Sequence, residues 1–139
     1  MVKKTLILCA AVGLASGLSI NSLMASQKSV TFVSPKDGAT VTSPFKTQFN
    51  QTGMTITPAG QEVNDKTKGH FHVIIDKPAV AEGQIIPVDP AHLHFGKGQT
   101  ESGEIKLPPG KHTLTLQFAD GLHRAYGPDL TKTITITVK

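Results

Sequence analysis

Residues 111–118 read KHTLTLQF, and the alternation of side chains in this stretch decides the fold. A period of two is typical of a β-strand with one buried side and one side facing solvent. The two sides are His112, Leu114, Leu116 and Phe118 on one and Lys111, Thr113, Thr115 and Gln117 on the other. The closing stretch KTITITV, residues 132–138, repeats the pattern with Ile134, Ile136 and Val138 on its apolar side.

Short strand-like segments separated by turn residues continue upstream of these two stretches. Residues 30–49, VTFVSPKDGATVTSPFKTQF, predict a strand, a Pro-Lys-Asp-Gly turn and a second strand. Three more strands are expected in HFHVIID, HLHF and GEIKL, residues 70–76, 92–95 and 103–107. The total of about seven strands indicates an all-β, immunoglobulin-like sandwich, with no helix longer than two turns.

The first residues, MVKKTLILCAAVGLASGLSINSLMAS, have the features of a secretory signal peptide. Two lysines precede a short apolar run that is broken by glycine and serine, and small residues follow near Ala25. We expect cleavage after Ala25, which leaves residues 26–139 as one domain exported to the periplasm or secreted. Cys9, the only cysteine of the chain, would leave with the peptide, so neither a disulfide nor a thiolate ligand is expected.

Charge and hydropathy patterning argue against two classes of partner. The net charge of +4 falls to +2 without Lys3 and Lys4, and the remaining basic residues are scattered singly among few aromatics. Nucleic-acid binding is therefore not expected. No apolar run after the signal peptide is long enough to span a bilayer. The chain also lacks the G-x-S-x-G and H-E-x-x-H patterns, and we expect no enzyme activity.

Two His-x-His pairs stand about twenty residues apart, in GHFHVIID at 69–76 and in AHLHFGKGQTE at 91–101. Residues two apart in a strand point the same way, with Cα atoms roughly 6.6 Å apart, so each pair can direct both imidazoles at one ion. The alternating neighbours form the better core face, which leaves four histidines on outer faces: His70, His72, His92 and His94. They can converge only if the two segments are neighbours in one sheet.

Two interpretations of these histidines remain open at this point. In the first, the two pairs form a divalent-metal site that His123, in the loop ADGLHRAYGPDLT, could complete. Imidazole ligands without cysteine suit Cu(II) or Zn(II), and Met54 is a candidate thioether ligand. In the second, the rings only hydrogen-bond to nearby backbone groups and hold loops in place. His112 begins an apolar face and is expected to be a hydrogen-bonded residue at the rim.

The run FGKGQT, residues 95–100, also has two interpretations. Backbone amides freed by its glycines, together with Lys97, could cradle an anion. A tight turn joining two strands is the simpler interpretation, since glycine readily supplies positive φ.

Taken together, GHFHVIID, HLHFGKGQTE, LPPGKHTLTLQFAD and the closing TITITV resemble the bacterial "domain of unknown function 4399" family. The resemblance covers nearly all of the chain after the signal peptide and implies a small, exported, β-rich domain without an established activity. Members of that family commonly carry H-N-H-x-P-H where this chain has DGLHRAYGP, so only His123 of that cluster is retained. The sequence thus predicts an exported, non-catalytic binding protein that holds Cu(II) or Zn(II). The alternative is a metal-free structural or protein-interaction module with a partner in the cell envelope.

Overall fold

The computed structural model describes residues 27–139, and the expected signal peptide lies outside these residues. Secondary structure in the described part is almost entirely β. Its elements are β1 (Ser29–Ser34), β2 (Thr40–Val41), β3 (Gln48–Thr52), β4 (Thr55–Ile56), β5 (Lys68–Ile75), β6 (His92–Phe95), β7 (Gly110–Ala119), the short 3₁₀ turn η1 (Pro128–Leu130) and β8 (Thr131–Val138). No helix in this part is long and apolar enough to cross a membrane.

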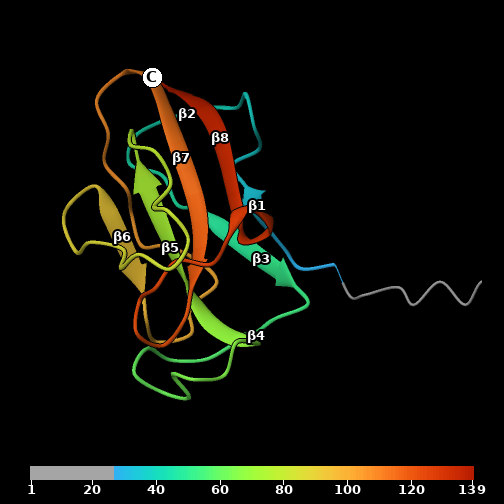
Figure 1. Cartoon of the computed structure of the whole chain (residues 1–139). Helices are drawn as coiled ribbons and strands as arrows, with labels where there is room; N and C mark the ends of the chain where they lie inside the picture. Colours follow the sequence, from blue (N-terminus) through green and yellow to red (C-terminus); the bar gives the residue numbers. More distant parts are fainter. Residues whose placement is uncertain (1–26) are drawn as a thin grey trace, which may run out of the picture.

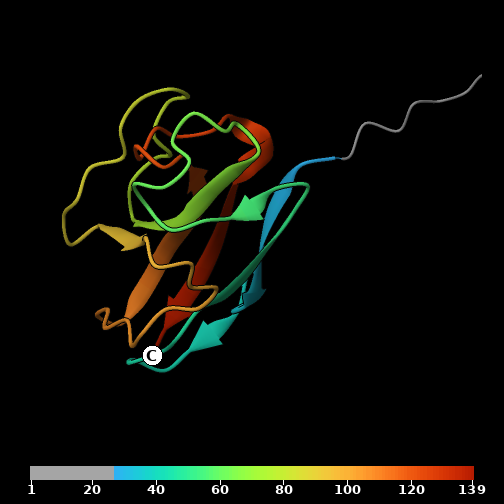
Figure 2. The same ribbon diagram turned by 90° about the horizontal axis from the view of Figure 1, so that it is seen from below.

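The strands form two sheets packed as a sandwich, which confirms the all-β prediction. The larger sheet has the order β2-β8-β7-β5-β4, and β6 also pairs with β5, while β1 and β3 form the smaller sheet. Figure 1 shows β7 between β5 and β8, and Figure 2 shows the β1–β3 layer to one side of the larger sheet. Phe49 of β3 connects the two layers. Its ring packs against those of Phe71 on β5 and Phe95 on β6, with distances of 4.8 and 4.9 Å between ring centroids.

The alternation in β7 and β8 places the core where the sequence predicts it. Leu114, Leu116 and Phe118 are fully buried, and the apolar residues of β8 are buried with them. The described residues have eight strands rather than about seven, because residues 30–49 contribute to three strands divided between the two sheets, β4 was not expected, and one expected strand is missing. Thr40–Val41 pairs in parallel with β8, whereas Gln48–Thr52 pairs with β1. The expected strand GEIKL forms only an isolated bridge, between Ile105 and Phe45.

The polar side of β7, which the sequence predicts to face solvent, is exposed at Lys111 but covered further along the strand. Thr115 and Gln117 are buried. The Gln117 side-chain amide donates to the Val80 carbonyl at 2.7 Å and accepts from the Val80 amide at 3.0 Å, which holds the β5–β6 connection over the sheet. Periodicity identifies the side that faces the other sheet, but it does not report whether a loop covers the opposite side.

Candidate metal centre

Strand pairing brings the two His-x-His segments side by side. β5 and β6 are antiparallel neighbours, and His72 lies directly opposite His94 in their register. Directly opposite residues on one face have Cβ atoms about 4.5–5.5 Å apart. The condition set by the sequence, that both segments belong to one sheet, is met. The centre therefore lies on the side of the larger sheet that faces away from the smaller one.

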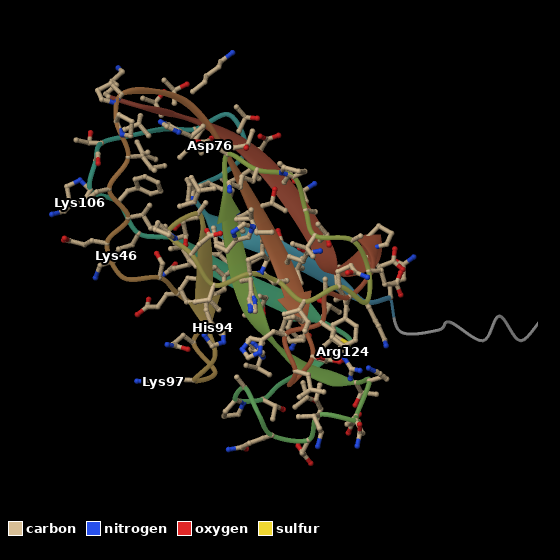
Figure 3. The ribbon with its side chains drawn as sticks, turned by 60° about the vertical axis from the view of Figure 1, so that its left-hand side comes forward. Lys46, Asp76, His94, Lys97, Lys106 and Arg124 are labelled. Atoms are coloured by element: carbon tan, nitrogen blue, oxygen red, sulfur yellow. The ribbon has the colours of Figure 1, made fainter. Side chains whose placement is uncertain are left out.

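The loop after β7 adds a third segment to this place. His123 lies in that loop with φ +64°, a left-handed conformation that histidine adopts more readily than most residues. Its Nε2 is 3.1 Å from Nε2 of His94, and its ring centroid is 5.0 Å from that of His70. Figure 3 shows His94 on the β6 side and Arg124, the residue after His123, on the facing loop.

Four imidazoles converge as a result: His70, His72, His94 and His123. One ligand nitrogen from each ring lies within 4.8 Å of those of all the others. A tetrahedral ion with bonds of about 2.0–2.1 Å separates its ligand nitrogens by about 3.4 Å. The 3.1 Å separation of the His94 and His123 nitrogens is close to that value, and the other ligand nitrogens lie within 4.8 Å of one another, so the rings must draw together to enclose an ion.

The other two histidines of the chain are committed to hydrogen bonds. His92 lies on β6 beside His94, but its Nδ1 is 2.8 Å from a carboxylate oxygen of Asp89, and it is not a member of the converging group. His112 places its Nδ1 2.6 Å from Asp76 and its Nε2 2.8 Å from the Pro108 carbonyl, which is the rim role expected of it. Acceptors outside the group thus occupy these two rings, whereas among the four converging rings the one hydrogen bond in the described residues joins His94 and His123 to each other.

Burial makes two of the four rings unusual. His70 is 0% exposed and His72 is 2% exposed, whereas His94 is exposed and His123 half-buried. Neither ring nitrogen of His70 has a hydrogen-bond partner, and the same is true of Nδ1 of His72. Buried polar atoms are nearly always paired, and an unpaired one is costly unless a ligand satisfies it. A bound ion would satisfy one nitrogen of each ring.

The electrostatics keep these rings ready to bind a cation. Burial, assisted by the neighbouring rings, lowers the pKa of His70 from 6.5 to about 4 and that of His72 to about 2. Burial also lowers the pKa of His94, with a smaller contribution from His123. Only a neutral imidazole can coordinate a metal. The buried pair is therefore in its binding form at neutral pH without having to release protons.

The donor set consists of imidazole nitrogens, without a carboxylate among the converging residues of the described part. Met54 does not contribute the thioether that the sequence left open, since it is buried in the hydrophobic core between the sheets. Imidazole donors are well suited to Cu(II) and Zn(II).

Gly96 supplies the space that the His94 ring occupies. A Cβ at this position would lie 2.2 Å from Cε1 and 2.3 Å from Nε2 of that ring, far inside van der Waals contact. The amide of Ala59 binds the Gly96 carbonyl at 2.9 Å, so a neighbouring loop also fixes the backbone here. The first glycine of FGKGQT thus makes room for a candidate ligand. Gly96 and Lys97 form a turn and Gly98 follows with φ +84°, but this turn does not join two strands as expected, because residues 101–107 form only isolated bridges.

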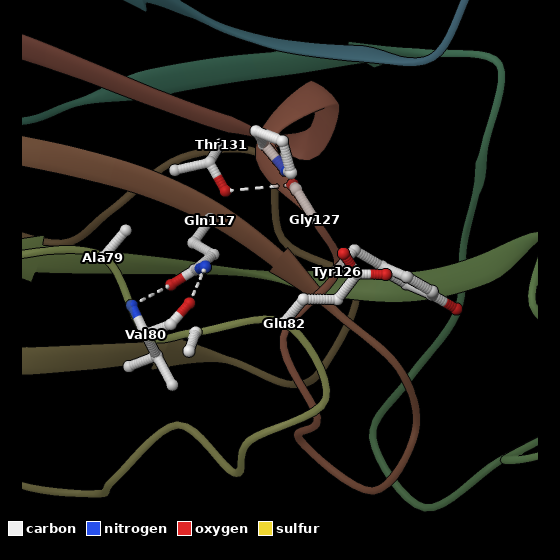
Figure 4. Close-up of a pocket in the computed structure, with 9 residues that line it drawn as sticks. Ala79, Val80, Glu82, Gln117, Tyr126, Gly127 and Thr131 are labelled. Atoms are coloured by element: carbon white, nitrogen blue, oxygen red, sulfur yellow. Dashed lines mark hydrogen bonds between the residues drawn. The ribbon is translucent and has the colours of Figure 1, made fainter.

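A pocket of about 340 Å³ opens elsewhere on the molecule, between residues 79–82 and the segment around Tyr126 (Figure 4). No histidine is among its lining residues. The buried polar residue among them, Gln117, already hydrogen-bonds to the Val80 backbone through its side-chain amide. The pocket offers little chemistry, and the histidine cluster is the stronger candidate site.

These features define a class, a small all-β sandwich that carries four converging histidines on one side of its larger sheet. The chain belongs to the family described as "Domain of unknown function (DUF4399)", whose model matches residues 47–139 and so includes all four converging histidines. A search of curated proteins finds no significant match. Among solved structures, the endo-beta-1,4-mannanase from Thermotoga petrophila is similar, with a TM-score of 0.43 and 13% identity over 81% of this chain. This chain spans only 20% of that mannanase chain.

Proposed function

We propose that this protein is an exported, non-catalytic metal-binding protein that holds one divalent ion, Cu(II) or Zn(II), through His70, His72, His94 and His123. The observation that carries the proposal is the convergence of four imidazoles that are not paired with acids, two of them buried with unpartnered nitrogens. The signal-peptide pattern at the start of the chain supports export.

The number of ligands supports binding rather than catalysis. Catalytic zinc sites keep a coordination position open for water or substrate, whereas closed sites use four protein ligands. Four imidazoles fill a tetrahedral shell, so an ion held by all of them has no position left for a substrate. Two of the ligands lie toward solvent, His94 and His123, which gives the ion a route in and out. This arrangement suits a protein that takes up and hands on an ion.

The metal-free alternative predicts that each ring is occupied by backbone or side-chain partners. His92 and His112 behave in that way, but the buried nitrogens of His70 do not. An envelope partner of this protein remains compatible with either function.

Titration of the purified protein with Cu(II) and with Zn(II) tests the proposal. We expect one ion per chain, and we expect single alanine substitutions of His70, His72, His94 and His123 each to weaken binding. His92→Ala and His112→Ala are the matched controls, because they remove a histidine that already has an acidic partner. The proposal fails if the wild-type protein binds neither ion, or if the control substitutions weaken binding as much as the four ligand substitutions.

A further inference from the structure

The turn that carries His123 is built around one buried carboxylate. Asp120 directly follows β7, and its side chain is 1% exposed. Its Oδ1 accepts from the backbone amides of Leu122 and Arg124 at 2.9 and 3.0 Å. Its main-chain carbonyl accepts from the His123 amide at 2.9 Å, and its own amide donates to the Arg124 carbonyl at 3.0 Å. Every backbone amide from 122 to 124 is thus bound to Asp120.

The second carboxylate oxygen fixes Asp120 itself. Oδ2 accepts from Nε of Arg124 at 2.8 Å and from Nζ of Lys66 at 3.0 Å. Lys66 belongs to the loop before β5, and the same loop binds the backbone next to Asp120, where the Gly60 amide donates to the Gly121 carbonyl at 2.9 Å. The turn is therefore attached to a second loop as well as to the end of β7.

The turn that Asp120 stabilises lies beside the buried histidines, so these hydrogen bonds affect the position of His123. Ala119, the last residue of β7, is the register partner of His70 on β5, so Asp120 begins the turn directly beside the buried ligand. The His123 carbonyl accepts from the Ile86 amide at 2.9 Å, which anchors the outer side of the turn. With φ at +64°, the His123 backbone is held in a conformation that an unrestrained chain seldom adopts.

We infer that Asp120 is the positioning residue of the metal centre, holding His123 over the buried His70 and His72 so that the fourth ligand is in place before the ion arrives. The inference rests on the proposed function. Asp120 is not itself a ligand, because both of its oxygens are occupied by donors of the protein. Residues that orient metal ligands typically change metal affinity about 10–100-fold when they are replaced.

The test is a double-mutant cycle in Cu(II) affinity, measured on the full protein. We expect Asp120→Ala to weaken binding by about tenfold or more in the wild-type background. In the His123→Ala background the same substitution should change affinity by less than about threefold, because its effect passes through a ligand that is already absent. The electron paramagnetic resonance spectrum of Cu(II)-loaded Asp120→Ala should match that of His123→Ala.

Two further variants separate positioning from a general loss of structure. Asp120→Asn keeps an acceptor for the turn amides of Leu122 and Arg124 but loses the acceptor for the Arg124 and Lys66 side chains, so it should recover part of the affinity that Asp120→Ala loses. Lys66→Ala removes one of the two donors to Oδ2, the more exposed one, and should weaken binding less than Asp120→Ala does. If Asp120→Ala does not yield folded protein, Asp120→Ser takes its place in the cycle. The serine hydroxyl supports the turn amides less well than the Asp120 carboxylate but better than alanine does, so we expect a smaller loss of affinity in the wild-type background than for Asp120→Ala.

The outcomes distinguish this inference from the proposed function. If the wild-type protein binds no Cu(II), the proposed function fails and Asp120 loses its role with it. If the wild-type protein binds and His123→Ala weakens binding, but Asp120→Ala leaves affinity unchanged, only the role of Asp120 is overturned. An equal loss from Asp120→Ala in both backgrounds also overturns it, because the residue would then act on the whole fold.

Discussion

Replacing Gly96 with alanine should remove His94 from the metal centre while leaving the fold intact. The new Cβ would lie 2.2 Å from Cε1 of the His94 ring, where apolar contacts normally require about 3.5 Å or more. The ring must therefore move by more than about 1 Å. His94 is exposed, so its ring can turn toward solvent without disturbing the core. The backbone of Gly96 is not in the left-handed region, so alanine adds no backbone strain, and the Cβ of Ala59, 3.0 Å from the new Cβ, must give way by a few tenths of an ångström.

The size of the effect follows from the loss of one ligand in four. Structural zinc sites bind with apparent free energies of roughly 10–16 kcal/mol, so one ligand of four corresponds to about 3 kcal/mol, or about a hundredfold in affinity. We expect Gly96→Ala to match His94→Ala in a calorimetric titration with Zn(II). The free energy of unfolding without metal, measured in urea, should change by less than about 1 kcal/mol.

Two neighbouring glycines provide matched controls for this substitution. Gly103→Ala meets nothing within 4 Å and should change neither stability nor affinity. Gly98→Ala forces a side chain into φ +84° and should lower stability by about 1 kcal/mol without touching His94, so its affinity for Zn(II) should stay at the wild-type value. Wild-type Zn(II) affinity in Gly96→Ala would refute the argument, because the ring would then not depend on the space at residue 96.

Three other predictions concern stability and processing. Leu116→Ala removes a fully buried side chain of β7 and should lower the free energy of unfolding by roughly 2–5 kcal/mol in urea titrations, whereas a loss under about 1 kcal/mol would mean that the core face is wrong. Because His70 takes up protons less readily in the folded state than in the unfolded chain, the metal-free protein should be most stable above pH 6.5 and lose roughly 3 kcal/mol through this ring as the pH falls from 6.5 to 4. His70→Gln should remove this share of the loss and leave the share due to His72, whose pKa is also lowered, and an unchanged profile would contradict the lowered pKa of His70. Mass spectrometry of the protein from its native host should find a chain that begins at Ser26, and an intact Met1 on soluble protein would contradict export.

The lowered pKa values also determine how metal binding depends on pH. Four histidines of ordinary pKa would all compete with protons as the pH falls through about 6.5. His70 and His72 are neutral well below that pH, so at pH 5.5 metal binding should displace no more than about two protons. Calorimetry in buffers of different ionisation enthalpy measures this number directly, and displacement of four protons would contradict it.

The sequence predicted the core and the placement of the histidine pairs because both depend on alternation within single strands. The period of two in 111–118 assigned Leu116 to the core, and the same rule placed His70 and His72 together on the opposite side. It could not predict that these two rings are buried, because burial on that side comes from loops whose positions have no periodicity. It also did not separate His92 from His94, although Asp89, three residues before His92, was an available sign of a local partner.

The roles of the residues that support the histidine cluster could not be predicted from the sequence. Gly96 looks like any turn glycine, and its role emerges only from the position of the His94 ring. Asp120 looks like a polar loop residue, and its burial depends on donors that include Lys66, which lies 54 residues away in the chain. Such contacts are set by how loops pack onto the finished sheet.

X-ray absorption spectroscopy of the Zn(II)-loaded protein tests the central claim most directly, because it counts the ligands of the ion and identifies their type. We expect four nitrogen ligands at about 2.0–2.1 Å with the multiple-scattering pattern of imidazole, reduced to three in His123→Ala. A first shell that contains sulfur, or that holds fewer than three imidazoles in the wild-type protein, would show that the ion is not held by His70, His72, His94 and His123.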